Sequence, residues 1–211
     1  DHEDLGMLAE ARSVLADGAF KADLERFIAP LLAPAAVNSL AQTLLKLTAP
    51  GVPDIYQGSE LWDLSLVDPD NRRPVDFKLR RRLLDELEGI TPEACWARSK
   101  EGLPKMYVLR KVLAVRRFHP EWFGAAGNYE PIVAAGRKMN HVIAYMRGRQ
   151  AMTIVPRLPI RLNGEWEDTA IHFPAGKWHN TFTGETVSGA APLAELLRRF
   201  PIAFLLREKG E

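Results

Sequence analysis

The chain has 211 residues, of which 46% are hydrophobic and 26% are charged, and its formal net charge is +1. These values are ordinary for a globular protein with a sizeable core. A charge so close to zero excludes the large basic field that binding to nucleic acid or an anionic membrane requires. The single cysteine, Cys95, excludes an internal disulfide and fits a reducing compartment, so we expect a cytoplasmic protein. No uninterrupted apolar run of about 18 residues occurs in the sequence, and we expect no leader sequence.

Residues 1 to about 120 have the apolar spacing of helices. Asn38 or Ser39 is the expected N-cap of a well-buried helix that Pro50 and Gly51 should end. The predicted helical segments are Leu5–Arg12, Phe20–Ile28, Leu40–Leu47, Lys78–Leu87 and Lys105–Phe118. Because the sequence begins at Asp1 rather than at Met, we also expect it to be a piece of a longer protein.

From Tyr129 onward the apolar period changes from that of helices to that of strands, with glycines between short segments. The predicted strands are Tyr129–Ala134, His141–Met146, Ala151–Val155, Thr169–Phe173, Lys177–Asn180, Glu185–Val187 and Ile202–Leu206. Short strands at this spacing favour an antiparallel sheet or sandwich. The chain should therefore have an α+β fold with two modules: residues 1–120, mostly helical, and residues 121–211, an antiparallel β-sheet domain.

Between the predicted helices lies a long polar segment, residues 50–77, which we call the site loop. It has too little apolar periodicity for a core element and too many aromatic and charged residues for a flexible linker. One short apolar piece, Val52–Tyr56, could be a strand. A long ordered loop rich in polar side chains usually lines a functional site.

The residue types of the site loop suit a carbohydrate. Sugar hydroxyls require paired donors and acceptors, and an aromatic side chain can cover the apolar face of a sugar ring. Paired carboxylates could also perform glycoside chemistry, although the spacing does not say which pair. The residues of these types are Asp54, Tyr56, Gln57, Glu60, Trp62, Asp63, Asp68, Asp70, Asn71, Arg72, Arg73 and Asp76. The competing interpretation, equally weighted for each acid, is that the acids pair with arginines and cap turns.

Other kinds of site have less support in the sequence. Asp68, Asp70 and Asn71 could supply oxygen ligands, but the spacing of a calcium loop is absent, so we expect no metal. No nucleotide-binding or α/β-hydrolase motif occurs, and we expect no cofactor. The five histidines are scattered, and Cys95 is expected to be a packed thiol. The basic run Arg80–Arg82 is interpreted as a solvated helix face beside Asp85, Glu86 and Glu88.

The segment NSLAQTLLKLTAPGVPDIYQGSELWDLSLVDPDNRRPVDF resembles the maltooligosyl trehalose synthases, a family within the α-amylase superfamily of glycoside hydrolases. GVPDIYQGSE is similar to the eighth barrel strand of that superfamily and the loop that follows it. The continuation ELWDLSLVDPDNRRPVDF is the more specific part, since ordinary amylases differ there. Further agreement in VLRKVLAVRRFHPEWF, HVIAYMR, VPRLP and WHNTFTGE extends the resemblance over essentially the whole chain.

This resemblance implies the last strand and helices of a (β/α)₈ barrel, followed by a β-sandwich domain. It also implies a reaction, catalysed by the complete enzyme as an intramolecular transglucosylase, that converts the reducing-end α-1,4 linkage of a maltooligosaccharide into an α,α-1,1 linkage. The motifs of the family's catalytic Asp, Glu and second Asp do not occur here, so we expect no catalytic residue and no activity of the chain alone. Asp1–Glu3 only superficially resembles one of these motifs.

The resemblance also assigns roles and partners. The expected polar contacts with sugar are Tyr56, Gln57, Glu60, Asp70, Asn71 and Arg72, and Trp62 is expected to stack on a sugar ring. Arg72 or Arg73 matches the arginine that helps to bind sugar after the eighth strand, and the other should pair with Asp68 or Asp76. The implied partners are a maltooligosaccharide and the missing N-terminal part of the barrel. The strand Val52–Tyr56 would lack its barrel neighbours, so we expect it to be irregular, covered by helices, or paired with another copy of the chain.

Two other classes of function remain open from the sequence. The chain could be an accessory carbohydrate-binding module, with Trp166, Trp178 or Tyr145 on its sheet as the binding aromatics. It could also be a scaffolding fragment without a ligand. The module is the weaker interpretation, because a lone tryptophan in a sheet is usually part of the core.

Overall fold

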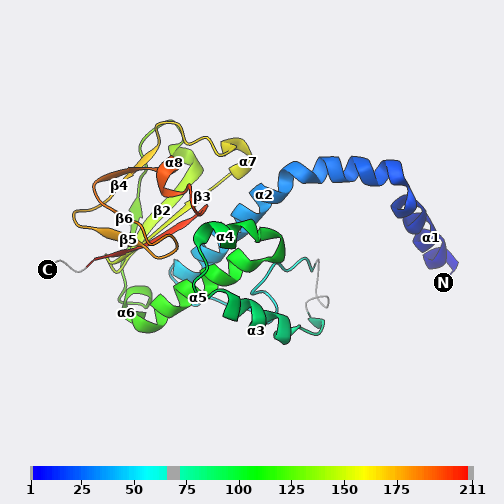
Figure 1. Cartoon of the computed structure of the whole chain (residues 1–211), viewed down its shortest axis with the longest axis horizontal. Helices are drawn as coiled ribbons and strands as arrows, with labels where there is room; N and C mark the ends of the chain where they lie inside the picture. The colour runs from blue at the N-terminus through cyan, green and yellow to red at the C-terminus, as the bar shows by residue number, and fades with distance from the viewer. Residues whose placement is uncertain (1, 66–71, 209–211) are drawn as a thin grey trace. The chain divides into compact units, whose positions relative to one another are not determined.

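The computed structural model describes residues 2–65 and 72–208. The chain divides into two compact units, residues 1–36 and 37–211. Helix α1 (His2–Ala16) and most of α2 (Gly18–Thr48) belong to the first unit (Figure 1). Asp17 separates the two helices, and its Oδ1 accepts hydrogen bonds from the N–H groups of Ala19 and Phe20, at 2.8 and 3.3 Å. This is the geometry of a helix N-cap.

Helix α2 corrects one sequence prediction. Asn38 and Ser39, expected to cap a separate helix, lie inside α2, which continues through Pro30 and Pro34. No cap is needed at residue 38, because the preceding turns of α2 already supply backbone acceptors. The helix ends at Thr48, as the Pro50–Gly51 signal predicts. By length and composition α2 could also cross a membrane, although core helices pass the same test and its last turns are buried.

The remaining helices belong to the second unit. Their bounds are α3 (Phe77–Glu86), α4 (Pro92–Ala97), α5 (Leu103–Phe118), α6 (Pro120–Phe123), α7 (Pro159–Leu162) and α8 (Leu193–Leu196), with 3₁₀ turns at Ser99–Glu101 and Met139–His141. The predicted helices Lys78–Leu87 and Lys105–Phe118 are confirmed as α3 and α5.

In the part of the chain that the structure describes, the strands form one six-stranded and one two-stranded sheet. The larger has the order β1 (Tyr129–Ile132), β2 (Val142–Arg147), β3 (Ala151–Pro156), β8 (Ala203–Arg207), β5 (Trp178–Asn180), β6 (Thr186–Val187). The smaller pairs β4 (Ala170–His172) with β7 (Ala190–Pro192), a strand not predicted from the sequence. All of these pairs are antiparallel. The mixed helix-and-sheet class is therefore confirmed.

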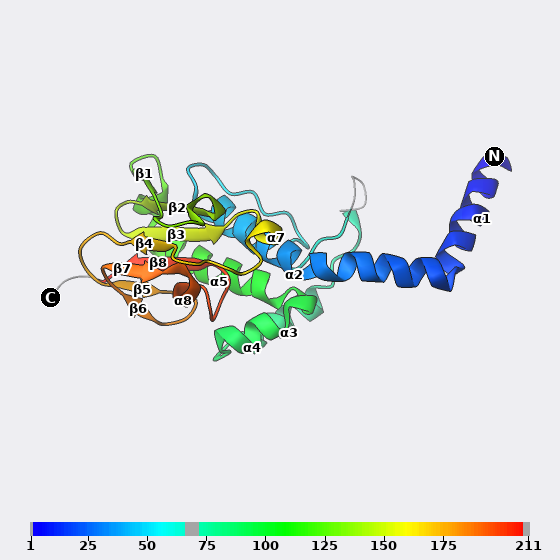
Figure 2. The same cartoon turned by 90° about the horizontal axis from the view of Figure 1, so that it is seen from above.

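The central strands of the larger sheet are buried on both faces. β3 and β8 lie side by side (Figure 2), and Met152 and Ile154 belong to a different apolar cluster from Ala151 and Val155. This alternation follows from the period of two in a strand. Met152 and Ile154 pack with the small sheet, while Ala151 and Val155 pack with the helices.

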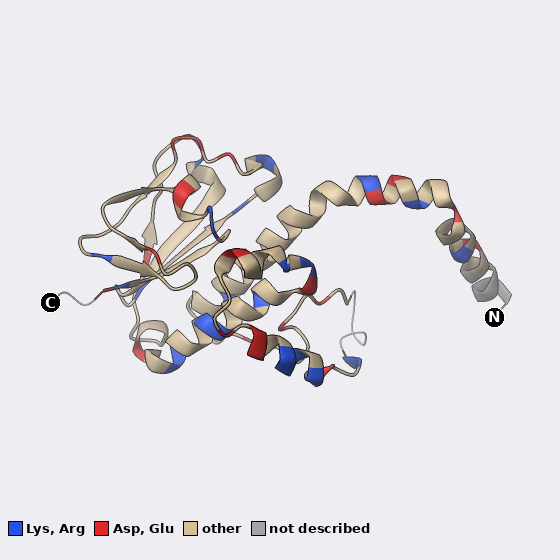
Figure 3. Ribbon diagram, viewed as in Figure 1, with Lys and Arg blue, Asp and Glu red and all other residues tan. Residues whose placement is uncertain are grey.

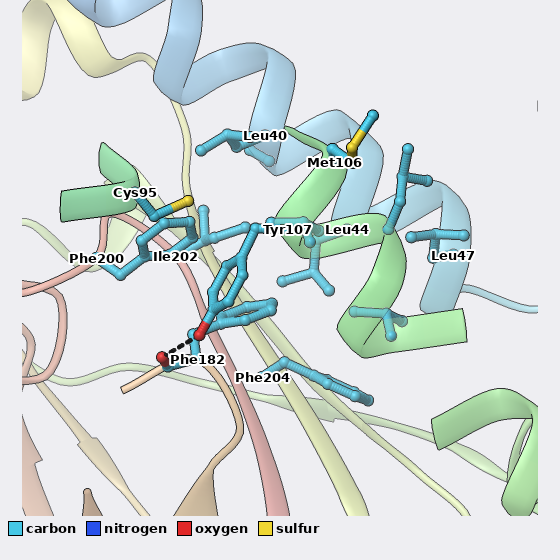
Figure 4. Packing of buried hydrophobic residues seen from close by; sticks show 14 of the residues in the cluster. Leu40, Leu44, Leu47, Cys95, Met106, Tyr107, Phe182, Phe200, Ile202 and Phe204 are labelled. Carbon is cyan, nitrogen blue, oxygen red and sulfur yellow. Dashed lines mark hydrogen bonds between the residues drawn. The ribbon is translucent and has the colours of Figure 1, made fainter. Parts of the chain in front are cut away.

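The end of α2, helices α3 to α5 and the larger sheet share one hydrophobic core. Figure 4 shows Leu40, Leu44 and Leu47 of α2 and Tyr107 of α5 packed with aromatic residues of the sheet region. The Tyr107 hydroxyl donates a hydrogen bond of 2.7 Å to the Phe182 carbonyl. The proposed module boundary near residue 120 stays a prediction.

A buried arginine connects this core to the chain around it. Arg147 at the end of β2 is 1% exposed, and its guanidinium donates to backbone carbonyls. The acceptors are Thr48 (3.0 Å), Phe123 (3.0 Å), Asn128 (3.2 Å), Gly127 (3.3 Å) and Gly124 (3.4 Å). The burial lowers the pKa of Arg147. Its hydrogen bonds join the end of α2, α6 and the sheet.

Replacement of Arg147 should therefore cost much of the stability of the second unit. We expect Arg147→Met to lower the free energy of unfolding by about 3 kcal/mol, because several buried carbonyls lose their donors. Arg157→Met, at an exposed position just after β3, should change it by less than about 0.5 kcal/mol. Urea unfolding followed by circular dichroism measures both. Equal stability of the two variants would contradict this role of Arg147.

Candidate functional site

The described part of the site loop has no strand. Residues 52–56 are irregular, and the side chain of Val52 is almost fully exposed (96%). Irregular backbone is one of the three outcomes expected for an orphan barrel strand. The loop follows the end of α2 and leads to α3, where Asp76 caps the helix by accepting from the Leu79 N–H at 2.9 Å.

Glu60 is bound by an arginine of α3. The Arg80 Nε donates to Glu60 Oε2 at 2.9 Å, and Arg80 Nη2 donates to the Gly58 carbonyl at 2.7 Å. The Arg80 side chain is only 17% exposed and that of Glu60 is 31% exposed. A charge-assisted hydrogen bond in this half-buried position is stronger than one on the open surface. Glu60 therefore has a structural partner within the chain.

Leu61 and Trp62 are held by the segment that contains Ser99 and Lys105. The Trp62 indole N–H donates to the Ser99 carbonyl, and Lys105 Nζ donates to the Leu61 carbonyl at 3.1 Å. Burial lowers the pKa of Lys105, and the positive charge of Lys46 lowers it further. Gly102, in the left-handed conformation (φ 78°), lies so close that a Cβ atom there would be 2.8 Å from the backbone nitrogen of Trp62.

Two candidate residues lie at a turn with exposed side chains. The Tyr56 carbonyl accepts from the Ser59 N–H at 3.1 Å and from the Ser59 hydroxyl at 2.6 Å. Tyr56 and Gln57 are both exposed, Tyr56 by 52%. This turn presents an aromatic ring and an amide together, a combination suited to the ring face and hydroxyls of a sugar.

The remaining candidates lie in or just after the segment 66–71. Asp70 and Asn71, like Asp68, lie outside the described residues. Arg72 and Arg73 are exposed, and neither is without an interaction partner. The expected pairing of one arginine with Asp68 or Asp76 stays a prediction.

Several acids of the site loop pair with an arginine or cap a turn or helix, as the competing interpretation of the sequence predicts. Asp76 caps α3, and Glu60 pairs with Arg80 rather than with Arg72 or Arg73. Asp63 accepts from the Ser65 N–H at 3.0 Å, and hydrogen bonds from the Ser65 hydroxyl and backbone hold the pKa of Asp63 below its usual value. These carboxylates stabilise turns and a helix start, as Asp does in such loops.

The sequence interpretation of the basic run is right for Arg82 and wrong for Arg80. Figure 3 shows basic and acidic residues along α3, and Arg82 is a solvated side chain (68% exposed) 3.6 Å from Glu86. Arg80 faces the loop, because in a helix residues two apart project from different sides. Arg80, Lys105 and Gly102 were missed because each contacts residues distant in the sequence.

The sheet aromatics proposed for a binding module are core residues. Trp166, Tyr145 and Trp178 are 7%, 2% and 0% exposed. The Trp178 indole N–H donates to the Pro174 carbonyl at 3.0 Å, and the Tyr145 hydroxyl lies 2.7 Å from that of Thr48. A sugar cannot stack on rings that are buried, so these three residues do not form a binding face. Within residues 2–65 and 72–208, no three His, Cys, Asp or Glu residues are grouped to hold a metal.

The contact at Gly102 gives a test of how firmly the loop is held. Gly102→Ala should lower the free energy of unfolding by about 2–4 kcal/mol, since it combines positive-φ strain with overlap against Trp62. Gly89 has a similar φ (74°) with no neighbouring atom within 4 Å, so Gly89→Ala should cost only about 1–2 kcal/mol. Thermal and urea unfolding compare the two. An equal cost would show that the contact with Trp62 is unimportant.

Cys95 should be inert in the folded chain. The thiol is fully buried in the shared core, and burial raises its pKa to about 12. Since the thiolate is the reactive form, iodoacetamide at pH 8 should label Cys95 only after unfolding in urea. Mass spectrometry of the intact protein measures this. Rapid labelling without denaturant would contradict the packed environment.

Comparisons with known proteins agree with this fold. No protein-family model matches the chain. Proteins named as maltooligosyl trehalose synthase from two strains of Mycobacterium tuberculosis are 43% identical to it over 195 residues, 92% of the chain and 24% of the relatives. The chain thus spans about a quarter of their length.

The solved maltooligosyltrehalose synthase of Arthrobacter ramosus is 40% identical with a TM-score of 0.84, covering 92% of this chain and 25% of that one. The Sulfolobus tokodaii protein described as a hypothetical maltooligosyl trehalose synthase is 27% identical, with a TM-score of 0.70 over 93% of this chain and 24% of its own. In sequence and in fold, the chain is similar to a portion of the maltooligosyl trehalose synthases, about a quarter of their length.

Proposed function

We propose that the chain is the C-terminal portion of an enzyme that forms a terminal trehalose unit on maltooligosaccharides. The observation that carries this proposal is the 43% identity to maltooligosyl trehalose synthases over 92% of the chain. The reaction replaces the reducing-end α-1,4 linkage by an α,α-1,1 linkage, so the complete enzyme acts as an intramolecular transglucosylase, an isomerase. We also propose the architecture that belongs to this function. The helical part of the chain completes a (β/α)₈ barrel, and the sheet part forms a β-sandwich.

The chemistry requires a retaining mechanism followed by a controlled transfer. A carboxylate nucleophile forms a covalent glycosyl-enzyme intermediate, while a carboxylic acid protonates the leaving oxygen. The released glucose must then turn so that its anomeric hydroxyl attacks the same carbon before water does. The part of the protein that holds this glucose decides between transfer and hydrolysis.

The site loop is the part of this chain that we assign to that task. Tyr56 and Gln57 support the assignment best, because their side chains are exposed on a hydrogen-bonded turn. Arg72 or Arg73 would bind sugar hydroxyls beside them. Glu60 and Trp62 already have partners within the chain, so we assign them to the shape of the loop. The sugar-contact roles of Asp70 and Asn71 remain proposals from the sequence.

The proposal also covers the partners of the chain and its place in the cell. Its partners are a maltooligosaccharide and the N-terminal part of the catalytic barrel, and we place the complete enzyme in the cytoplasm, without nucleic acid or membrane. The catalytic carboxylates belong to the N-terminal part, so the chain alone is inactive. Without that part, the irregular segment 52–56 could also pair with a second copy of the chain.

A chimera tests the function directly. Residues of this chain replace the matching quarter of the Mycobacterium tuberculosis relative, and the products from maltopentaose are separated by chromatography. We expect the chimera to form trehalose-terminated product, whereas this chain alone and the relative without its matching quarter should form none.

Two outcomes would contradict the proposal. Turnover by the isolated 211-residue chain would show that it contains its own catalytic groups. A chimera that folds, as shown by a cooperative thermal transition, but makes no trehalose-terminated product would show that this chain cannot serve as that part of the enzyme. The unmodified relative, assayed in parallel, controls for substrate quality.

A further inference from the structure

Arg80 uses all three nitrogens of its guanidinium to bind the site loop. Nε donates to the Glu60 carboxylate (2.9 Å), Nη2 to the Gly58 carbonyl (2.7 Å) and Nη1 to the Asp76 carbonyl (3.2 Å). Gly58 and Glu60 lie near the start of the loop and Asp76 lies at its end. One side chain therefore fixes two points of the loop that are 16 or more residues apart in the sequence.

The surroundings of Arg80 favour a fixed geometry. Its side chain is 17% exposed, so water competes weakly for the guanidinium, and a charge-assisted hydrogen bond is correspondingly strong. Gly58 has a φ of 90°, and a Cβ atom there would lie 3.2 Å from Val75. The planar fork of an arginine suits these three acceptors, whereas a lysine offers only one nitrogen.

Gly58 is directly adjacent to the exposed pair of candidate sugar contacts. Tyr56 and Gln57 precede it, and the Tyr56 carbonyl is bound by Ser59 on its other side. Arg80 thus fixes the backbone of the turn that carries the Tyr56 and Gln57 side chains. Ordering the turn before a ligand arrives removes that entropy cost from binding.

We propose that Arg80 is a positioning residue that sets the conformation of the Tyr56–Glu60 turn for the trehalose-forming reaction. It acts through the backbone and through Glu60 rather than by touching the sugar. The effect of Arg80 on the reaction rests on the proposed function. Its effect on the conformation of the turn does not, because that effect can be measured on the isolated chain. Glu60 accordingly works as the partner of Arg80.

The structural part is tested on the full 211-residue chain by hydrogen exchange and mass spectrometry. Arg80→Met should raise the exchange rate of the amides in residues 57–62 by about tenfold or more, and leave α5 and the sheet unchanged. Arg80→Lys should restore part of the protection, since it keeps the charge and one donor. Arg81→Met, an exposed neighbour on the same helix, is the matched control and should behave as the native chain.

The catalytic part is tested in the chimera with maltopentaose. Arg80→Met should lower kcat/KM by about tenfold to a hundredfold, because a misplaced turn holds the glucose badly. It should also raise the ratio of free glucose to trehalose-terminated product, since water then competes for the intermediate. Arg80→Lys should show a smaller change in both quantities, and Arg81→Met none.

The outcomes separate the two proposals. Unchanged exchange in Arg80→Met, or a uniform rise over α3, α5 and the sheet, would overturn the positioning role. Altered exchange together with an unchanged product ratio and kcat/KM in an active chimera would overturn it as well. An inactive native chimera refutes the proposed function alone, because the exchange experiment does not depend on activity.

Discussion

The buried guanidinium of Arg147 is the constraint on which the second unit depends. It has no carboxylate partner among its bonds, and its donors are satisfied by carbonyls from the end of α2, from α6 and from the segment before β1. A buried charge is tolerable only when it is hydrogen-bonded throughout. These segments must therefore meet at fixed positions around one side chain. The end of α2 is placed by the sheet, and the site loop begins only a few residues after it.

A second polar group reinforces this junction. The Thr48 hydroxyl donates to the Leu44 carbonyl at 2.7 Å and lies 2.7 Å from the Tyr145 hydroxyl, and Thr153 donates to Thr48 at 2.9 Å. Burial raises the pKa of Tyr145, so the neutral phenol is the form present in this network. Satisfied buried networks specify one arrangement of the segments around them. The helices and the sheet therefore share a core with both apolar and polar connections.

The sequence allowed the longer helices and most of the strands of the second unit to be predicted, because their apolar period is local. The short helices α4, α6, α7 and α8 were not predicted, since four to six residues are too few to show a helical period. Leu40–Leu47, Ala151–Val155 and Ile202–Leu206 each have one clear pattern. The false cap at Asn38 arose because capping residues also occur inside helices, where neighbouring turns supply the acceptors. Strand β7 is short and contains Pro192, so its pattern was too weak to recognise.

The site loop was recognised from its composition, but the function of its individual side chains was not. The partner of Glu60 is Arg80, 20 residues away in the sequence. The sequence of the loop alone does not show which helix contacts it. The same applies to Trp62, whose indole binds Ser99 across 37 residues. Residue types identify the chemistry that a segment can perform, while long-range packing decides which side chains remain available for it.

The polar side chains of the site loop differ in how they are bound by the rest of the chain. Arg80 donates to Glu60 Oε2 and holds this carboxylate in a fixed orientation, so that Glu60 stabilises the loop. Tyr56 and Gln57 differ from Glu60, because their side chains are exposed while their backbone is fixed. A transfer reaction that must exclude water benefits from this combination, since a rigid backbone fixes the position of the acceptor and exposed side chains bind it. The acids nearest to Arg80 thus stabilise the loop, and the uncharged residues beside them are the better candidates for contact with sugar.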